Sequence, residues 1–268
     1  MFDRDRNQPD RYQGPKPAGQ PVGGAPTQGG ITGGVVINGQ RVGINQREGL
    51  LTMSFVWMFA ALLLSAFAAY FVYSNPSIQT FVVKWYFALI IGELGLVLAI
   101  SFGINKIGAL PALALLFVYA LLTGLTIGAL VQAYVGKGDP TAMAAVASSF
   151  VGASAVFGGA ALYGFATKRD LTGIGGILFM GLIGLIAMSF VQVFFFSGNS
   201  TFNLVIGAVG VLIFTGLTAY HVQALKNGKL SRVQNAQSAS VVGALVLYLD
   251  FINLFLMMLR IFGGGGRS

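Results

Sequence analysis

Long, uninterrupted stretches of apolar residues occupy most of the chain after residue 50, and short polar connections separate them. Each stretch reaches about the 20 apolar residues that a membrane helix needs. The apolar residues are continuous rather than alternating, which favours helices over the strands of a membrane barrel. We therefore predict seven membrane-spanning helices, at residues 50–73, 85–104, 108–134, 141–166, 171–196, 202–223 and 240–262.

The beginning of the chain has a different composition. It is rich in Gly, Pro, Gln and Asn and poor in large apolar side chains, so it cannot bury enough surface to offset the entropy of ordering. It also lacks the basic region followed by an apolar core that is typical of a secretory signal peptide. We predict a disordered tail at residues 1–46, a seven-helix membrane domain at 47–263 and a flexible C-terminus at 264–268.

The charged residues support lipid as the solvent and give an orientation. Only 9% of residues are charged and 55% are hydrophobic, whereas an ordinary soluble domain has about 25% charged residues. With the N-terminus in the cytoplasm, twelve Lys and Arg residues face that side and four face the other, which fits the positive-inside rule. The predicted fold class is an all-α membrane protein with a cytoplasmic N-terminus and an external C-terminus. No basic module with interleaved aromatic residues is present, so we expect no nucleic-acid partner.

Small residues recur in two of the predicted helices. In lipid, small residues let helix backbones approach closely. We therefore predict that these positions pack against neighbouring helices: Gly152, Ala153, Gly158, Gly159 and Ala160 in one segment, and Gly173, Gly176, Gly181 and Gly184 in the next.

Three ionisable residues lie inside predicted spans, namely Glu93, His221 and Asp250. Ionisable groups within a membrane are costly and usually face the bundle interior or a water-filled cavity, which makes each of them a candidate for function. The structural alternative for the two carboxylates is a packing hydrogen bond, and for His221 it is contact with water at the helix end. Asn253 follows Asp250 by three residues and therefore shares its helix face.

His221 and Asp250 lie on consecutive segments, both in the half of the membrane nearer the 224–238 connection. Because the connection is short, we expect the two helices to be antiparallel neighbours. An imidazole and a carboxylate within reach of each other form an ion pair when the imidazole is protonated, and the pair opens when the carboxylate gains a proton or the imidazole loses one. The sequence thus predicts a proton-operated latch.

Enzymatic alternatives find less support. Ser154 in the sequence GASA precedes His221 in the same order as the serine and histidine of rhomboid intramembrane proteases, but Ala155 stands where that family has a glycine. One histidine and two separated carboxylates are too few ligands for a zinc site, and cysteine is absent. We expect no enzymatic activity and no cofactor, and we assign no metal ligands.

The last two predicted helices contain TGLTAYHVQALKNGK and VGALVLYLDFINLFLMMLRIFG, and the third contains FVYALLTGLTIGALVQAYV. These sequences resemble the Bax inhibitor family, also called the transmembrane Bax inhibitor motif family, over residues 47–263. The resemblance implies a seven-helix fold whose last helix is enclosed by the other six. It also implies a pH-dependent calcium leak that uses two aspartates near the cytoplasmic side. Asp250 matches the second aspartate. The first stands in the pattern T-A-Y-D-x-Q, which matches here at Thr218, Ala219, Tyr220 and Gln223.

His221 occupies the aspartate position of that pattern. Two carboxylates would share one proton, whereas a His–Asp pair forms an ion pair, and it offers one oxygen fewer to calcium, which takes six to eight oxygen ligands. We predict a pH-sensitive cation (calcium) leak channel of a bacterial inner membrane, gated by His221 and Asp250. Glu93 lies along the ion pathway, and Tyr220, Gln223 and Asn253 support the gate. The alternative is a non-transporting protein that modulates a membrane-bound ATP-dependent protease, for which the N-terminal tail is the favouring feature.

Overall fold

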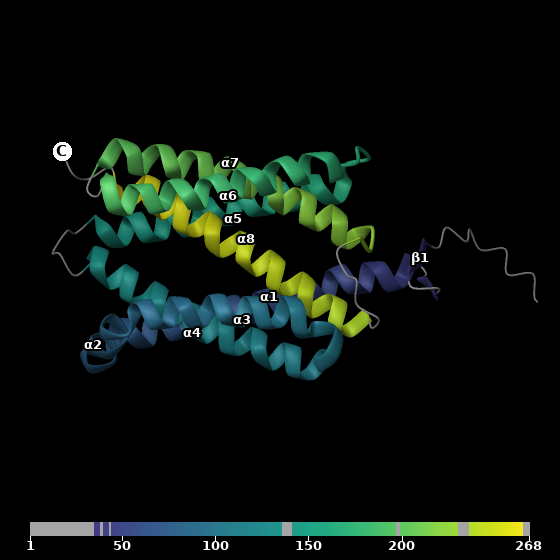
Figure 1. Ribbon diagram of the computed structural model, residues 1–268, viewed down its shortest axis with the longest axis horizontal. Helices are drawn as coiled ribbons and strands as arrows, with labels where there is room; N and C mark the ends of the chain where they lie inside the picture. Colours follow the sequence, from purple (N-terminus) through teal and green to yellow (C-terminus); the bar gives the residue numbers. More distant parts are fainter. Residues whose placement is uncertain are drawn as a thin grey trace, which may run out of the picture. The chain divides into compact units, whose positions relative to one another are not determined.

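The computed structural model describes residues 35–37, 40–42, 44–135, 141–196, 199–229 and 236–264, all within one compact unit. These residues form eight helices and one antiparallel pair of short strands (Figure 1). The strands are β1 (Val35–Ile37) and β2 (Gln40–Val42). The helices are α1 (Ile44–Ser74), α2 (Pro76–Lys84), α3 (Tyr86–Ile107), α4 (Ala109–Val135), α5 (Ala142–Ala166), α6 (Thr172–Phe195), α7 (Ser200–Lys226) and α8 (Ala236–Gly264).

Each of the seven predicted segments corresponds to a helix and extends at most one residue beyond either end of it, and α2 is an addition. Asn75 has an extended backbone and precedes Pro76, which starts α2 at a position where proline is favoured. α2 and α3 then meet at a bend of 72°. Six helices of the described part are each long and apolar enough to cross a membrane, and α2 with α3 makes a seventh if the bent pair is one span.

The start of the membrane domain differs from the predicted boundary. α1 begins at Ile44, and the two strands occupy residues that were assigned to the disordered tail. In the sequence, Asn38 and Gly39 follow the β-branched run Val35–Ile37, and Asn-Gly is the dipeptide most typical of a two-residue hairpin turn. The composition of the tail as a whole concealed this local signal. The rest of the predicted tail and residues 265–268 lie outside the described residues.

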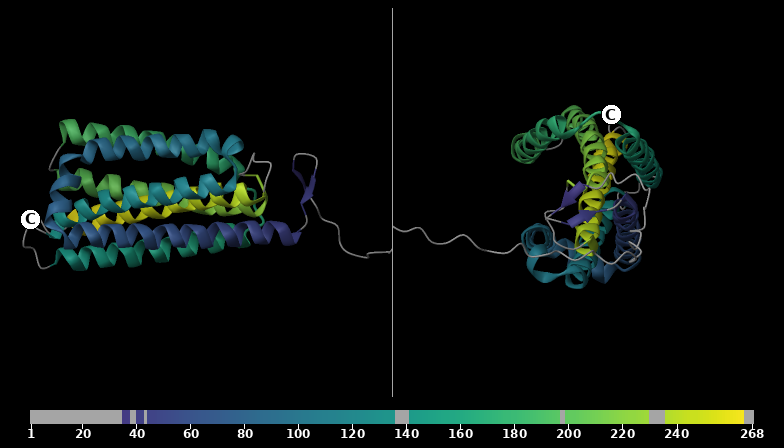
Figure 2. Two further views of the ribbon diagram at one scale, coloured as in Figure 1. Left: turned by 90° about the horizontal axis from the view of Figure 1, so that it is seen from below. Right: turned by 90° about the vertical axis from the view of Figure 1, so that its right-hand side faces the viewer.

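Helix α8 packs against α1, α4, α5 and α7, and to a smaller extent against α3. The end-on view in Figure 2 shows α8 between one group of helices that includes α1–α4 and another that includes α5–α7. The apolar core follows this arrangement, because Leu247, Tyr248 and Leu254 of α8 are fully buried. In the most apolar part of α8, 67% of the residues are buried, compared with 11% in the corresponding part of α6. Among the six long apolar helices, α8 is therefore the most buried and α6 the least.

Close backbone approaches occur at other glycines than those predicted. A Cβ atom added at Gly164 of α5 would collide with the Ala219 carbonyl oxygen of α7, so only glycine fits this helix contact. Ala153 and Ala160 are buried. However, an added Cβ meets no atom within 4 Å at Gly158, Gly159, Gly173, Gly176 and Gly184. The predicted packing role of these five glycines is wrong. For the three on α6, the reason is that this helix packs chiefly against α7 and exposes most of its surface.

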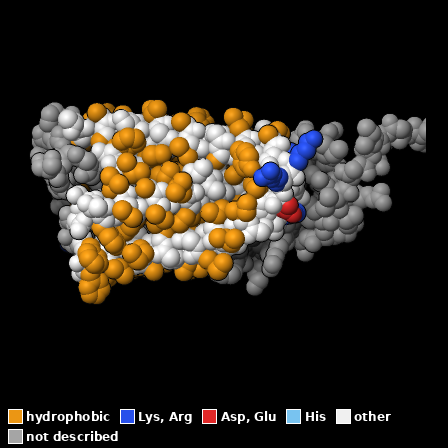
Figure 3. Space-filling model, turned by 90° about the horizontal axis from the view of Figure 1, so that it is seen from above, with side chains coloured by type: hydrophobic (Ala, Val, Ile, Leu, Met, Phe, Trp, Pro, Cys, Tyr) orange, Lys and Arg blue, Asp and Glu red, His pale blue; other side chains and the backbone are white. Residues whose placement is uncertain are grey.

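The outer surface is apolar over most of its length. Figure 3 shows hydrophobic side chains spread over one face, with Lys, Arg and acidic side chains gathered at one end. Phe87, Leu110 and Phe194 are each at least 75% exposed. Soluble monomers rarely expose contiguous apolar patches of this kind, so this surface is suited to hydrocarbon rather than water.

Candidate functional site

His221 of α7 and Asp250 of α8 are in direct contact. The Nδ1 atom of His221 lies 2.7 Å from Oδ2 of Asp250. The Asp250 side chain is 4% exposed and the His221 side chain 18%. The pair is therefore buried on the carboxylate side and partly accessible on the imidazole side. A buried carboxylate needs a charged or hydrogen-bonding partner, and His221 supplies it.

Close packing fixes the end of α7 that carries His221. Gly175 of α6 leaves room for the Tyr220 ring, since a Cβ there would lie 2.7 Å from that ring. The absence of a side chain at Gly164 lets α5 approach the backbone of α7 at Ala219, as described above. Tyr220 thus packs against α6, and its ring also lies beside the His221 imidazole, with the ring centroids 5.3 Å apart.

Gln223 holds the connection between α5 and α6. Its Nε2 donates to the carbonyl oxygen of Arg169 at 2.6 Å, and its Oε1 accepts from the backbone N–H of Leu171 at 2.8 Å. Lys226, one turn further along α7, donates to the carbonyl oxygen of Phe165 at 2.6 Å. The described hydrogen bonds of Gln223, predicted as a supporting residue, therefore hold this connection, and none of them joins the His–Asp pair.

The same connection contains an exposed charged group, Asp170. Its Oδ1 accepts hydrogen bonds from the hydroxyl and the backbone N–H of Thr172 at 2.5 and 3.0 Å, and its Oδ2 lies 3.3 Å from Lys229 Nζ. The Thr172 hydroxyl first, then the Thr172 backbone N–H and Lys229, lower the pKa of Asp170 to about 2. Asp170 therefore stays ionised in all but strongly acidic solution.

Asn253 and Glu93 have other partners than the His–Asp pair. Asn253 Nδ2 donates to the carbonyl oxygen of Leu249 in its own helix at 2.8 Å. Glu93 Oε1 accepts from the Thr126 hydroxyl of α4 at 2.8 Å. The hydrogen bond that the shared helix face suggested between Asn253 and Asp250 is thus absent among those described.

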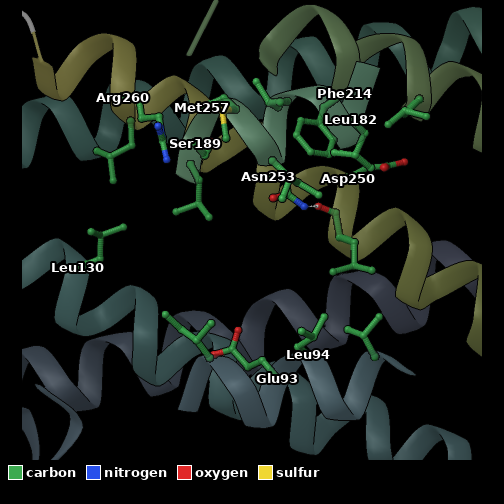
Figure 4. A pocket seen from close by; sticks show the side chains of 18 of the residues that line it. Glu93, Leu94, Leu130, Leu182, Ser189, Phe214, Asp250, Asn253, Met257 and Arg260 are labelled. Carbon is green, nitrogen blue, oxygen red and sulfur yellow. Dashed lines mark hydrogen bonds between the residues drawn. The ribbon is translucent and has the colours of Figure 1, made fainter. Parts of the chain in front are cut away.

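A cavity of about 1060 Å³ nevertheless brings these residues together, since Glu93, His221, Asp250 and Asn253 all line it. In Figure 4, Glu93 reaches into the cavity from α3, opposite Asn253 and Asp250 on α8. Apolar side chains from α3, α6 and α8 form most of the remaining wall. The three ionisable groups that the sequence singled out therefore share one space.

Sequence reasoning did not find the polar cluster at the other end of this cavity. Arg260 of α8 donates to Oε1 of Gln192 at 2.8 Å, and Gln192 donates to Oδ1 of Asn203 at 3.1 Å. All three residues line the cavity. A signal was available, because Gln192 is an amide within an otherwise apolar segment.

Within the described residues, the hydrogen bond of the His221 ring leads to Asp250, and none joins that ring to Ser154 of α5. Within the described residues there is also no group of three or more His, Cys, Asp or Glu side chains placed to hold a metal ion. The described site thus consists of a His–Asp pair, one further carboxylate and a large cavity.

The apolar surface, the six long apolar helices and the intramembrane pair define an all-helical integral membrane protein. Residues 47–267 match the family described as "Inhibitor of apoptosis-promoting Bax1", and the chain belongs to this Bax inhibitor family. It is similar to the inner membrane protein YbhL of Escherichia coli strain K12, with 39% identity over 82% of this chain and 94% of the relative. An uncharacterized protein of Deinococcus radiodurans is 37% identical over 83% of this chain and 93% of the relative. An uncharacterized membrane protein of Streptococcus pyogenes is 37% identical over 66% and 74%.

Proposed function

We propose that this protein is a pH-sensitive cation leak channel of a bacterial inner membrane, with calcium as the candidate ion and the His221–Asp250 pair as the gate. The observation that carries the proposal is the 2.7 Å contact of these side chains at the wall of the same cavity that Glu93 enters. In this reading, α2 and α3 act as one bent span, which gives seven crossings with α8 enclosed by the others. The N-terminus lies in the cytoplasm and the C-terminus outside.

The pair works as a gate because its attraction depends on protons. A protonated imidazole and an ionised carboxylate hold α7 and α8 together, and histidine is the side chain whose ordinary titration lies nearest to physiological pH. A further proton on Asp250, or the loss of the proton from His221, removes the charge attraction. The contact then weakens to a neutral hydrogen bond, worth roughly 1 kcal/mol. The α7–α8 contact is then free to open toward the cavity.

Glu93 gives the pathway a second carboxylate. Glu93 on α3 and Asp250 on α8 lie on opposite walls of the cavity (Figure 4). Hard divalent cations bind oxygen ligands, and calcium takes six to eight of them. Two carboxylates supply far fewer than these six to eight oxygen ligands, so calcium would bind weakly here and pass through rather than be held tightly. The protein thus needs neither a resident cofactor nor a catalytic group.

The test is flux of calcium and of monovalent cations into proteoliposomes between about pH 5 and pH 8, where histidine commonly titrates. The natural protein should conduct with a clear pH dependence. Asp250→Asn should abolish that dependence, and His221→Ala, which leaves Asp250 unpaired, should shift its midpoint. Ser189→Ala is the matched control, because Ser189 lines the same cavity without a titratable group.

Unchanged pH dependence in both pair variants would disprove the gate. Flux no greater than in empty liposomes would disprove the channel itself. In that case, modulation of a membrane-bound ATP-dependent protease becomes the function to test, by measuring substrate turnover with and without residues 1–46.

A further inference from the structure

The cavity that contains the gate is open toward the side of the bundle. α3 packs chiefly against α4, and α6 chiefly against α7, so these two helices form the rims of the opening. Rim residues on both helices are exposed although they line the cavity: Ile90 and Leu94 on α3, and Ile186 and Phe190 on α6. Since both helices lie along the apolar surface, the opening faces the hydrocarbon of the bilayer.

The floor of this lateral cleft is apolar over most of its length. It is formed by α8, where Leu249 and Leu256 are half-buried and point toward the cleft. The lining on α8 extends from Val246 to Arg260, which at ~1.5 Å per residue is roughly 21 Å along the helix. That length exceeds half of the ~30 Å hydrocarbon thickness, so one acyl chain of a single leaflet fits along the cleft.

One end of the cleft carries its only described Lys or Arg side chain, Arg260, with Gln192 and Asn203 beside it. Figure 4 shows the Arg260 guanidinium reaching into the cavity. These residues lie near the ends of the spans on α6, α7 and α8, the depth of the lipid headgroups. Trp85 and Tyr86, at the adjoining start of α3, are typical of the aromatic belt at that depth. A guanidinium binds phosphate oxygens in a bidentate manner.

Two features of the cleft favour a lipid as its occupant. The carboxylates both have partners, since Asp250 contacts His221 and Glu93 accepts from Thr126, so no unpaired anion faces the acyl chain. The second feature is the size of the cavity, about 1060 Å³. The volume lies at the upper end of the range for small-ligand pockets.

We propose that the cleft between α3 and α6 binds one phospholipid, with an acyl chain along α8 and an anionic phosphate headgroup on Arg260. The lipid covers the apolar wall beside the His221–Asp250 pair and closes the cavity on its bilayer side. This inference does not depend on ion conduction, because it concerns only what fills the cleft.

The test is photolabelling of the full-length protein in phosphatidylcholine vesicles that contain a small fraction of phosphatidylglycerol with a diazirine on one acyl chain. Labelled residues are identified by mass spectrometry. Label should appear on Leu249 or Leu256 of α8 and be absent from Leu254, which is fully buried on the other side. Ile183 of α6, exposed outside the cleft, serves as the internal standard for contact with bulk lipid.

Two variants separate the headgroup from the cleft. Arg260→Gln should lower the α8 label relative to Ile183 roughly ten-fold, because hydrogen bonds to charged groups are strong. Ile186→Trp narrows the opening and should lower the label several-fold. Phe179→Trp, elsewhere on the cleft wall, and Leu212→Trp, exposed on α7 outside it, are the comparison pair, and only the former should reduce the label.

The results that would overturn the proposal are equally specific. An unlabelled α8 with a labelled Ile183 would mean that water or protein fills the cleft. Equal α8 labelling by a phosphatidylcholine probe, unaffected by Arg260→Gln, would remove the anionic headgroup from the proposal. Flux measurements do not enter either outcome, so a failure here is distinguishable from a failure of the channel proposal.

Discussion

The two flanks of α8 differ in how they are covered inside the membrane. On the α7 side, glycines bring backbones into contact, and a histidine neutralises a buried carboxylate. On the side between α3 and α6, apolar side chains line an open cleft. Lipid is as apolar as leucine, so nothing drives two leucine-rich helices to close over α8. A buried charge such as that of Asp250 does drive α7 and α8 together, because the carboxylate needs the His221 imidazole as its partner. The tight flank is thus determined by polar chemistry and the open flank by its absence.

The largest effect should come from the tight flank. His221→Ala leaves the Asp250 carboxylate buried without its partner, and removal of one member of a buried pair costs about 3–5 kcal/mol of unfolding free energy. Asp250→Asn combined with His221→Ala should cost clearly less than the sum of the single changes. Chemical unfolding in detergent micelles at neutral pH measures all three. Simple additivity would mean that the 2.7 Å contact contributes nothing.

A smaller effect compares glycines of the two environments. Gly164→Ala forces a Cβ onto the Ala219 carbonyl, so we expect a loss of about 1–3 kcal/mol from overpacking. Gly184→Ala, in the middle of α6, meets open space and should gain about 0.5–1 kcal/mol, since alanine is the better helix former. The thermal midpoints of the two variants in detergent should therefore move in opposite directions. Equal destabilisation of both would contradict the exposed position of α6.

The smallest effect concerns the exposed loop that Gln223 holds. The pKa of Asp170 is lowered from 3.8 to about 2, with the Thr172 hydroxyl as the first cause. Because the pKa is lowered on folding, the resulting stabilisation is complete above about pH 4 and disappears as the pH falls toward 2. Thr172→Val should raise the pKa of Asp170 toward 3.8, and Lys229→Gln should raise it less. A carboxyl titration by NMR on labelled aspartate measures both, and a larger rise for Lys229→Gln would reverse the order of causes.

Parts of the fold could be read from the sequence because they depend on local composition. The seven apolar segments correspond to helices, since backbone groups in hydrocarbon must bond within their own segment. Helix α2 was not predicted, although Asn75–Pro76 is the local signal for the break between α1 and α2. The roles of individual glycines were also missed in part. Spacing along one helix does not say which face meets a neighbour, so Gly173 and Gly164 look alike in the sequence.

The candidate site divides in the same way. The sequence by itself determined that Glu93, His221 and Asp250 need partners, because an ionisable group in hydrocarbon is costly wherever the chain places it. The sequence also predicted His221 as the partner of Asp250, because the two residues lie on consecutive helices joined by a short connection. Only the tertiary structure decided the other partners: Thr126 for Glu93, and the connection at residues 167–171 for Gln223. The cleft with Arg260 at its end also belongs to the tertiary structure, because side chains from five helices, α3, α4, α6, α7 and α8, line it. The cost of a buried charge is a local property, whereas its compensation depends on which helices pack together.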